Sequence, residues 1–410
     1  MINLSNAVRA FALVAGGLAL SACQTGTGAL APSSSATPPQ TGQPGTQTGQ
    51  AAGGAGSLRT PTRQFKGQAI GNGPVRVALL LPTGSQGGLG AVAAEMANAA
   101  RLGVRDFGQG RLQIILKDTQ GQTPEAALGA EQARDEGASL IMGPLLSANV
   151  SASKGVAQPS GIPLLAFTSD LSRAGRGTYL LTFPPQADVS RTISYAASQG
   201  QRRIVALLPQ SNYGRVVEAA LRTAVDESGG QVVSIARYNN DAASINLAAR
   251  TVALATAQAD AIYMPDGRGT PQKLLQALQA NGAQLAGKQI LGSGQWEDMN
   301  LSSRALQDAL FSGSDKRNFE EFARRYQASY GARPSATAAL AYDAVSLASQ
   351  LAQRNPQAPF TANAFQSPSG FSGASGIFRF RATGRPQRGL VVYRVENGRP
   401  VVVDPAPTRF

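Results

Sequence analysis

The stretch VRVALLLPTGSQGGLGAVAAEMANAARLGVR (residues 75–105) contains the pattern that the rest of the chain repeats. Its first seven residues are apolar except for Arg76 and show little alternation, which is typical of a parallel strand buried on both faces. A glycine-rich turn follows at residues 83–90, and apolar residues then recur at helical spacing. Glycine lets a ligand approach the backbone, and the start of a helix favours anions, so Ser85 is a candidate ligand-binding residue. A plain connection between strand and helix is the alternative interpretation.

The same order of strand, turn and helix recurs along the chain, which predicts the α/β class. Further apolar runs form a first series at residues 112–116, 139–143, 162–167 and 179–183, and a second series at residues 203–208, 231–237, 260–264 and 289–292. We therefore expect two Rossmann-like lobes with a hinge and an interlobe cleft. Lobe 1 is expected from residues 74–185 and about 313–385, and lobe 2 from residues 186–312 and about 386–410.

The charge balance is basic, with a formal net charge of +13 that arginine largely supplies. Such a balance can indicate a nucleic acid or an anionic membrane surface as partner. The arginines, however, are scattered along the expected helices and loops instead of standing in blocks. We interpret them as a basic solvated surface and expect no nucleic-acid partner.

The chain contains no histidine, and Cys23 is its only cysteine. These counts exclude catalysis by Ser-His-Asp or Cys-His groups, histidine metal sites and intrachain disulfides. Residues 88–93 fit a loose dinucleotide-binding fingerprint, but an ordinary turn explains their glycines equally well. Adjacent carboxylates, such as Glu297 with Asp298, are more typical of solvated faces than of acid–base pairs. We expect a protein that is not an enzyme, with no metal and no cofactor.

The first 22 residues look like an export signal, with an apolar run at residues 11–20 that is too short to span a bilayer. The run ends in Leu-Ser-Ala-Cys, which resembles the bacterial lipobox and predicts lipidation of Cys23. An ordinary signal peptide with a chance cysteine is the alternative. Because Gln24 and not aspartate follows the cysteine, a Gram-negative cell would sort the lipoprotein to its outer membrane.

Residues 23–73 are mostly alanine, glycine, serine, threonine, proline and glutamine. This composition cannot bury enough apolar surface to fold, so we interpret the segment as a flexible, disordered linker behind the lipidated cysteine. Such a coil has a root-mean-square span of roughly 40 Å. Fully extended, it could reach on the order of 160 Å.

Five short segments, in this order, carry a resemblance to a known family. They are GPLLS (residues 143–147), GIPLLAFTS (161–169), SNYG (211–214), LAYDAV (340–345) and FSGASGIFRF (371–380). Together they resemble the leucine-binding-protein family, which has the type I periplasmic binding fold. Each match is weak alone, but five in the right order over most of the chain favour this fold.

The resemblance implies two lobes that close on a ligand at the carboxyl ends of their strands. It implies ligand-binding roles in the first lobe for Ser147, Thr168, Ser169 and Asp170, and in the second lobe for Tyr213, Asp266 and Trp296. The acid of the second lobe stays open, because Glu297 and Asp298 follow directly after the tryptophan. The aspartate stands where amino-acid binders usually have threonine, and it would repel a ligand carboxylate. It could instead cap the segment that follows it, and the tryptophan could line the cleft or fill the core.

The resemblance also implies a function. One hypothesis is solute binding, with an amino-acid-like or cell-wall-derived ligand such as a muropeptide delivered to an ABC permease. The lipobox and the long linker look more like a related branch, the outer-membrane lipoproteins that activate penicillin-binding proteins. The second hypothesis is therefore a regulator of a class A penicillin-binding protein in peptidoglycan synthesis. Both place the protein at the periplasmic side of the envelope, attached to a membrane through Cys23.

Overall fold

The computed structural model describes residues 66–297 and 299–410 of the chain. All described residues belong to one compact unit of the chain. The predicted signal peptide, the lipidation at Cys23 and most of the predicted linker lie outside the described residues. In the part of the chain that the structure describes, no helix is long and apolar enough to span a bilayer.

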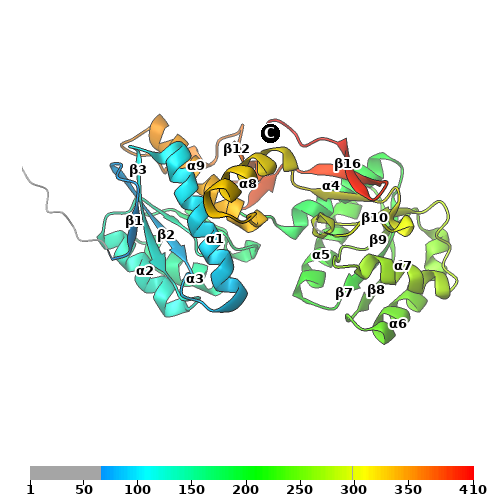
Figure 1. Cartoon of the computed structure of the whole chain (residues 1–410). Helices are drawn as coiled ribbons and strands as arrows, with labels where there is room; N and C mark the ends of the chain where they lie inside the picture. The colour runs from blue at the N-terminus through cyan, green and yellow to red at the C-terminus, as the bar shows by residue number, and fades with distance from the viewer. Residues whose placement is uncertain (1–65, 298) are drawn as a thin grey trace, which may run out of the picture. The chain divides into compact units, whose positions relative to one another are not determined.

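The first sheet has six strands in the order β1-β3-β2-β4-β5-β6 (Figure 1). Its strands are β1 (Gln68–Ile70), β2 (Val75–Leu81), β3 (Leu112–Asp118), β4 (Leu140–Met142), β5 (Leu164–Ala166) and β6 (Thr178–Leu180). All neighbouring strands are parallel except β1, which pairs antiparallel with β3. The helices of this part of the chain are α1 (Gly87–Gly103), α2 (Thr123–Asp135), α3 (Ser147–Ala157), α8 (Lys316–Tyr330), α9 (Ala336–Arg354) and α10 (Ala362–Phe365).

The residues of β2 alternate between two hydrophobic cores. Val77 and Leu79 pack with the apolar residues of α1 and α9, whereas Ala78 and Leu80 pack with those of α2 and α3. Because β2 buries side chains on both faces, all its residues except the partly buried Arg76 are apolar. Helices therefore cover both faces of the first sheet.

The strand β1 corrects the predicted linker, which was expected to extend to residue 73. Gln68 pairs with Leu116 and Ile70 with Ile114, so backbone hydrogen bonds hold this segment to the edge of the sheet. Of the three β1 residues, only Ile70 is partly buried. Composition alone was misleading here because an edge strand needs few apolar side chains when its backbone is paired.

The second sheet has seven strands in the order β16-β15-β11-β10-β9-β7-β8. Its strands are β7 (Arg203–Pro209), β8 (Gln231–Tyr238), β9 (Ala261–Tyr263), β10 (Gln289–Leu291), β11 (Leu310–Gly313), β15 (Val391–Glu396) and β16 (Arg399–Asp404). Its helices are α4 (Pro185–Ser198), α5 (Asn212–Glu227), α6 (Ala242–Val252) and α7 (Thr270–Ala280). Alternate residues of β7 again face two cores, one shared with α4 and α5 and the other with α6 and α7.

The chain passes between the two sheets more than once. It leaves the first sheet after β6, and after β11 it returns to α8 and α9, which pack in the core of the first sheet. A small antiparallel sheet of β12 (Phe371–Gly373), β13 (Gly376–Phe380) and β14 (Pro386–Arg388) then precedes β15. These elements confirm the expected α/β fold with two Rossmann-like sheets. The exact lobe boundaries expected from the sequence stay a prediction.

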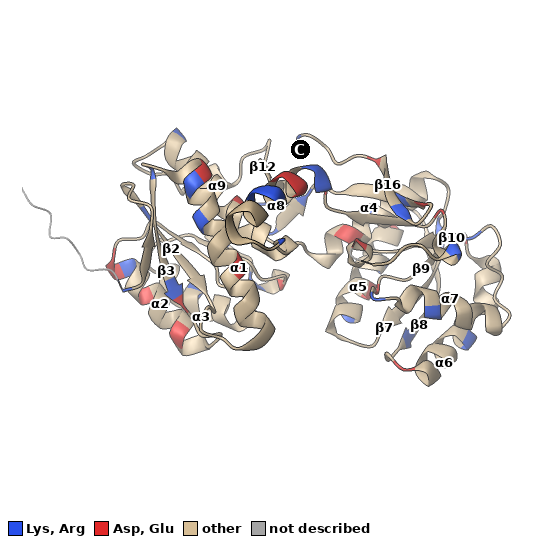
Figure 2. Cartoon of the chain, in the orientation of Figure 1, with Lys and Arg blue, Asp and Glu red and all other residues tan. Residues whose placement is uncertain are grey.

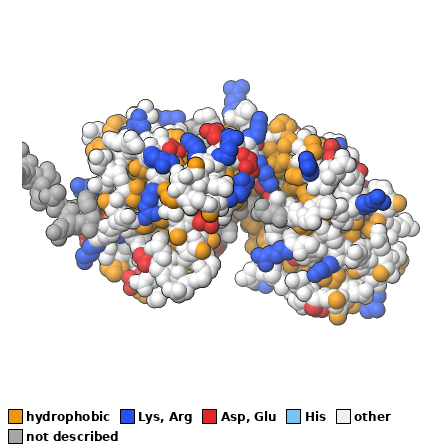
Figure 3. Space-filling view, in the orientation of Figure 1, with side chains coloured by type: hydrophobic (Ala, Val, Ile, Leu, Met, Phe, Trp, Pro, Cys, Tyr) orange, Lys and Arg blue, Asp and Glu red, His pale blue; other side chains and the backbone are white. Residues whose placement is uncertain are grey.

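Charged residues are spread over the elements of both sheets (Figure 2). On the face shown in Figure 3, lysine and arginine side chains are interspersed with acidic and uncharged ones. This distribution agrees with the interpretation of the basic residues as a solvated surface.

A buried carboxylate joins two of the segments that carried the family resemblance. Asp343 of α9 is only 1% exposed, and its carboxylate accepts hydrogen bonds from the backbone N–H of Ala374 (2.6 Å) and Ser375 (2.9 Å) and from the Ser375 hydroxyl. A Cβ at Gly373 would come within 2.4 Å of this carboxylate, so only glycine fits there. Burial raises the pKa of Asp343, and the hydrogen bonds oppose that rise. The carboxylate therefore fixes the turn between β12 and β13 to α9.

Substitution of this carboxylate should destabilise the protein. In Asp343→Asn, one of the turn N–H groups would face an NH₂ group and lose its acceptor, so we expect the free energy of unfolding to fall by about 3 kcal/mol. Urea unfolding followed by circular dichroism measures the change. Asp226→Asn, on the exposed face of α5, should change it by no more than about 0.5 kcal/mol. Equal stability of the two variants would contradict the structural role of Asp343.

Candidate functional site

A cavity of about 470 Å³ lies where the connections between the two sheets meet. Phe183 lines it from the segment before α4, Asp188 from the first turn of α4, and Tyr213 from the start of α5. Further lining side chains are those of Glu297, Lys316, Glu320, Arg333, Ser375 and Arg388. Its wall thus combines aromatic rings with charges of both signs.

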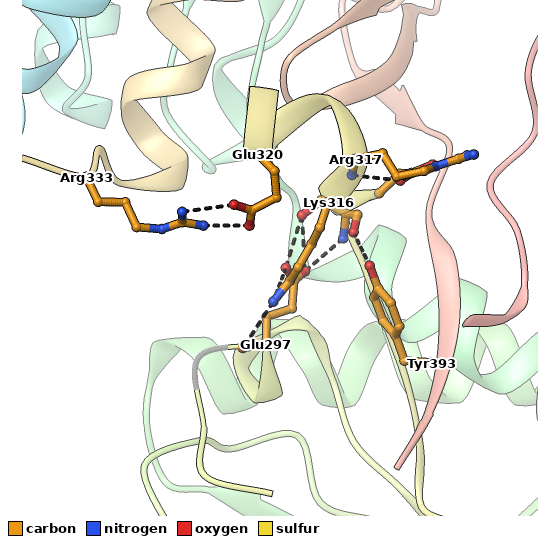
Figure 4. Close-up of polar contacts among 8 residues, drawn as sticks. Glu297, Lys316, Arg317, Glu320, Arg333 and Tyr393 are labelled. Carbon is orange, nitrogen blue, oxygen red and sulfur yellow. Dashed lines mark hydrogen bonds and ion pairs between the residues drawn. The ribbon is translucent and has the colours of Figure 1, made fainter. Parts of the chain in front are cut away.

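Two ion pairs occupy part of this wall (Figure 4). Glu320 of α8 accepts two hydrogen bonds from the guanidinium of Arg333, at 2.9 and 2.6 Å. Lys316 donates to the backbone oxygen of Glu297 at 3.1 Å, and its Nζ lies 3.8 Å from the Glu297 carboxylate. The same carboxylate accepts from the backbone N–H of Ser314 at 2.8 Å. These four charged side chains therefore already have partners within the protein.

Tyr213 presents its ring to the cavity because the start of α5 holds it there. The Ser211 hydroxyl caps the helix by accepting from the Gly214 N–H at 3.2 Å, and a Cβ at Gly214 would clash with the Pro209 carbonyl. The tyrosine hydroxyl lies 3.3 Å from both the Pro265 carbonyl and the Ser293 hydroxyl. Burial raises the pKa of Tyr213 to about 12, so the ring stays neutral near pH 7. It can offer apolar contact to a ligand without adding charge.

Among the charged side chains that line the cavity, those of Asp188 and Arg388 have the largest pKa shifts. Burial, with a smaller contribution from the Glu297 carboxylate, raises the pKa of Asp188 to about 8. Burial lowers the pKa of Arg388 to about 10, while Asp343 and Asp188 act in the opposite direction. In both cases removal of water disfavours the charged form. Neither residue was predicted from the sequence, because nothing local in it shows that Arg388 becomes buried, and Asp188 half-buried, beside a cavity.

The first-lobe residues singled out by the resemblance do lie together, at the carboxyl ends of parallel strands. The Ser147 hydroxyl donates to the Asp170 carboxylate at 2.5 Å, and the Asp170 N–H donates to the Thr168 hydroxyl at 3.2 Å. Asp170 also accepts from the N–H of Ser172 at 3.0 Å and from Nε of Arg173 at 2.9 Å. The Ser147 bond first, then those of Ser172 and Arg173, hold the pKa of Asp170 well below its usual range.

These contacts confirm the alternative in which Asp170 caps the segment after it. The segment is the short 3₁₀ helix Leu171–Arg173. Ser169 is exposed, and Ser85 is half-buried in the turn that follows β2. None of the five first-lobe residues is among those that line the cavity. A ligand-binding role for them stays a prediction.

The two remaining predicted residues lie beside each other, and neither lines the cavity. Asp266 accepts from the Tyr238 hydroxyl at 3.1 Å, and its backbone oxygen accepts from the Trp296 indole N–H at 2.9 Å. Trp296 is fully buried, and a Cβ at Gly292 would collide with its ring. Of the two alternatives for this tryptophan, the structure shows the core position. Within residues 66–297 and 299–410, no group of three or more acidic side chains is placed to hold a metal ion.

Comparisons with known proteins agree with the fold. A family model described as "Periplasmic binding protein" matches residues 74–400. No curated protein sequence matches the chain.

Solved structures share the fold. One is a Rhodospirillum rubrum protein assigned to a branched-chain amino acid ABC transporter, with a TM-score of 0.69 and 20% identity over 80% of this chain and 99% of that one. A Desulfitobacterium hafniense ABC transporter substrate-binding protein in complex with Leu has a TM-score of 0.59 and 17% identity over 80% and 99%. A Rhodopseudomonas palustris solute-binding protein in complex with 3,4-dihydroxybenzoic acid has a TM-score of 0.57 and 18% identity over 82% and 98%.

The raised pKa of Asp188 predicts a pH dependence of stability. Between the ordinary carboxyl pKa near 4 and the value of about 8, the folded protein keeps the Asp188 proton that the unfolded chain releases. The free energy of unfolding should therefore fall through this window as the pH rises. Asp188→Asn removes this pH-dependent loss of stability. The melting temperature of the variant should therefore rise relative to that of the wild type as the pH increases from 5 to 9.

Thermal melts followed by circular dichroism at several pH values measure this difference. Asp226→Asn serves as the control, because Asp226 lies on the exposed face of α5 and does not line the cavity. A constant difference between Asp188→Asn and wild type across the range would contradict the prediction.

Proposed function

This chain belongs to the periplasmic binding protein family, and from that premise we propose that it binds a small organic solute in the cavity beside Tyr213. The cavity is the observation that carries the proposal. Its volume of about 470 Å³ falls in the range of roughly 300–1,000 Å³ that small-molecule sites occupy. An aromatic ring and several charged groups converge on it, as in sites that fix the orientation of a ligand. We propose that the site binds and releases its ligand without chemical reaction.

The ligand that we propose is amino-acid-like or derived from the cell wall. The structurally similar proteins include one in complex with Leu and one in complex with 3,4-dihydroxybenzoic acid, both of which are small carboxylic acids. A cavity with charges of both signs suits a small polar solute better than a hydrocarbon. In this proposal an ABC permease receives the ligand, as expected of a transport receptor.

A solute screen with tyrosine variants tests the proposal. We expect one or more amino acids or muropeptides to raise the melting temperature of the wild type, and Tyr213→Ala to weaken that binding about tenfold or more, because the ring supplies apolar contact area. The matched control is Tyr195→Ala, since this residue packs on the same hydrophobic core as Tyr213 but does not line the cavity. Equal weakening in both variants would place the ligand elsewhere, and no binding of any solute would contradict the proposal.

A second candidate function is activation of a penicillin-binding protein. The observation that favours it is the hydrogen bond between Ser147 and Asp170. The hydroxyl that the resemblance would assign to a ligand carboxylate is already used within the protein, and the aspartate adds a negative charge there. A first lobe of this kind is poorly suited to the usual amino-acid contact, whereas a regulator needs no such contact.

Both candidates include an anchor at Cys23, which we propose is lipidated and attached to the outer membrane in a Gram-negative cell. Cells labelled with radioactive palmitate should incorporate label into the wild type and not into Cys23→Ser. Affinity capture from detergent-solubilised envelopes then separates the candidates, because only the regulator should retain a class A penicillin-binding protein. Label in Cys23→Ser would contradict the anchor, and capture of an ABC permease instead would contradict the regulatory role.

A further inference from the structure

Arg388, at the end of β14, is a buried cation whose side chain is only partly satisfied. The residue is 7% exposed, yet it lines the cavity. Its Nη2 donates to the backbone oxygen of Ser375, whereas Nε and Nη1 have no hydrogen-bond partner. Among the ion pairs of the described residues, none includes Arg388. The other basic side chains at the cavity differ in this respect, because Lys316 and Arg333 are paired with Glu297 and Glu320.

An unsatisfied guanidinium is costly in a buried position. Each buried donor without a partner costs about 1–3 kcal/mol, and more when the group is charged. Buried charges in folded proteins are normally paired with an opposite charge. Nε and Nη1 are themselves shielded from solvent in this structure, so an anionic group in the cavity would remove this cost once the side chains beside them move enough to admit it.

The remaining donors match a carboxylate. A guanidinium has five N–H donors in one plane, and the Ser375 carbonyl accepts from one of the two on Nη2. Whichever of these two hydrogens is used, the other lies beside a free nitrogen, either Nε or Nη1. One edge with two parallel donors is therefore left, and two parallel N–H groups fit the two oxygens of a carboxylate.

The surroundings hold this guanidinium in a fixed orientation. Its carbon lies 4.4 Å from the ring centroid of Phe183 and 5.4 Å from that of Phe378. Its partner Ser375 is itself bound to the Asp343 carboxylate through backbone and hydroxyl. Because these contacts exist without a ligand, little ordering entropy would be lost on binding.

We propose that Arg388 is the anchor for a carboxylate group of the ligand, in the cavity that it shares with Tyr213. The inference rests on the proposed function, since it names the chemical group that the same cavity recognises. Asp188 also lines this cavity, so a ligand that carries an ammonium group besides its carboxylate has an oxygen acceptor there as well. The carboxylate is the required group, and the ammonium is not.

Pairs of probes that differ in this one group test the proposal. L-leucine, 4-methylpentanoate and benzoate carry a carboxylate, whereas 3-methylbutylamine and benzylamine carry an amine in its place. By isothermal titration calorimetry we expect the wild type to bind one or more of the carboxylates and neither amine. Arg388→Gln should weaken that binding about tenfold or more, as loss of a charged hydrogen bond does. Arg388→Lys should be intermediate, because it keeps the charge and loses the two-donor edge.

The matched control is Arg379→Gln, on the neighbouring strand β13. Arg379 also stacks on an aromatic ring, that of Phe410 at 4.8 Å, but its Nε and Nη1 donate to Gln387 and Pro368, and it does not line the cavity. This variant should bind carboxylates like the wild type. If Arg388→Gln does not fold, NMR of arginine Nε–H groups in the wild type replaces it, and the Arg388 signal, assigned with Arg388→Lys, should shift on addition of benzoate.

The outcomes separate this inference from the proposed function. Binding of an amine but of no carboxylate, lost in Tyr213→Ala, would overturn the role of Arg388 and leave solute binding intact. Carboxylate binding that is lost in Tyr213→Ala but unchanged in Arg388→Gln would also overturn the role of Arg388 and leave solute binding intact. Absence of binding by every probe and every solute of the wider screen would overturn both.

Discussion

The arrangement of the cavity depends on the hydrogen bonds that the buried carboxylate of Asp343 accepts. It lies on α9, in the core of the first sheet, and its partners are N–H and O–H groups of the turn between β12 and β13. Through Ser375 the same network continues to the guanidinium of Arg388. The helix α9 thereby fixes the Arg388 guanidinium at the wall of the cavity, through hydrogen bonds that join Asp343, Ser375 and Arg388.

Removal of water explains the electrostatics of this wall. Burial raises the pKa of Asp188 and of Tyr213 and lowers that of Arg388, so each group is shifted toward its neutral form. The same loss of solvent strengthens any hydrogen bond that a ligand makes with these groups. Lys316 and Arg333 differ because protein carboxylates already neutralise them. The cavity therefore offers a few unsatisfied groups among many satisfied ones, which favours selectivity for a particular ligand charge.

Sequence patterns predicted those features of the fold that depend on residues close together in the chain. The apolar run of β2, the glycine beside Tyr213 and the order of five short motifs predicted the α/β fold and the family. Edge pairing of β1 was missed, because its backbone hydrogen bonds leave no mark on side-chain composition. The bond between Ser147 and Asp170 was not predicted, since residues 23 positions apart were assigned roles one by one. Only the cap that Asp170 forms on the segment after it was among the alternatives.

The sequence by itself determined the alternation of strands and helices, because apolar periodicity depends only on which face of each element is buried. It also determined that histidine chemistry is excluded, because the chain has no histidine. Only the tertiary structure decided that Trp296 fills the core and that Asp188 and Arg388 face one cavity. Those two residues are 200 positions apart, and their burial arises from elements that meet only when the whole chain has folded. A property such as the missing partners of a guanidinium belongs to that assembled environment, and no local pattern of residues could have shown it.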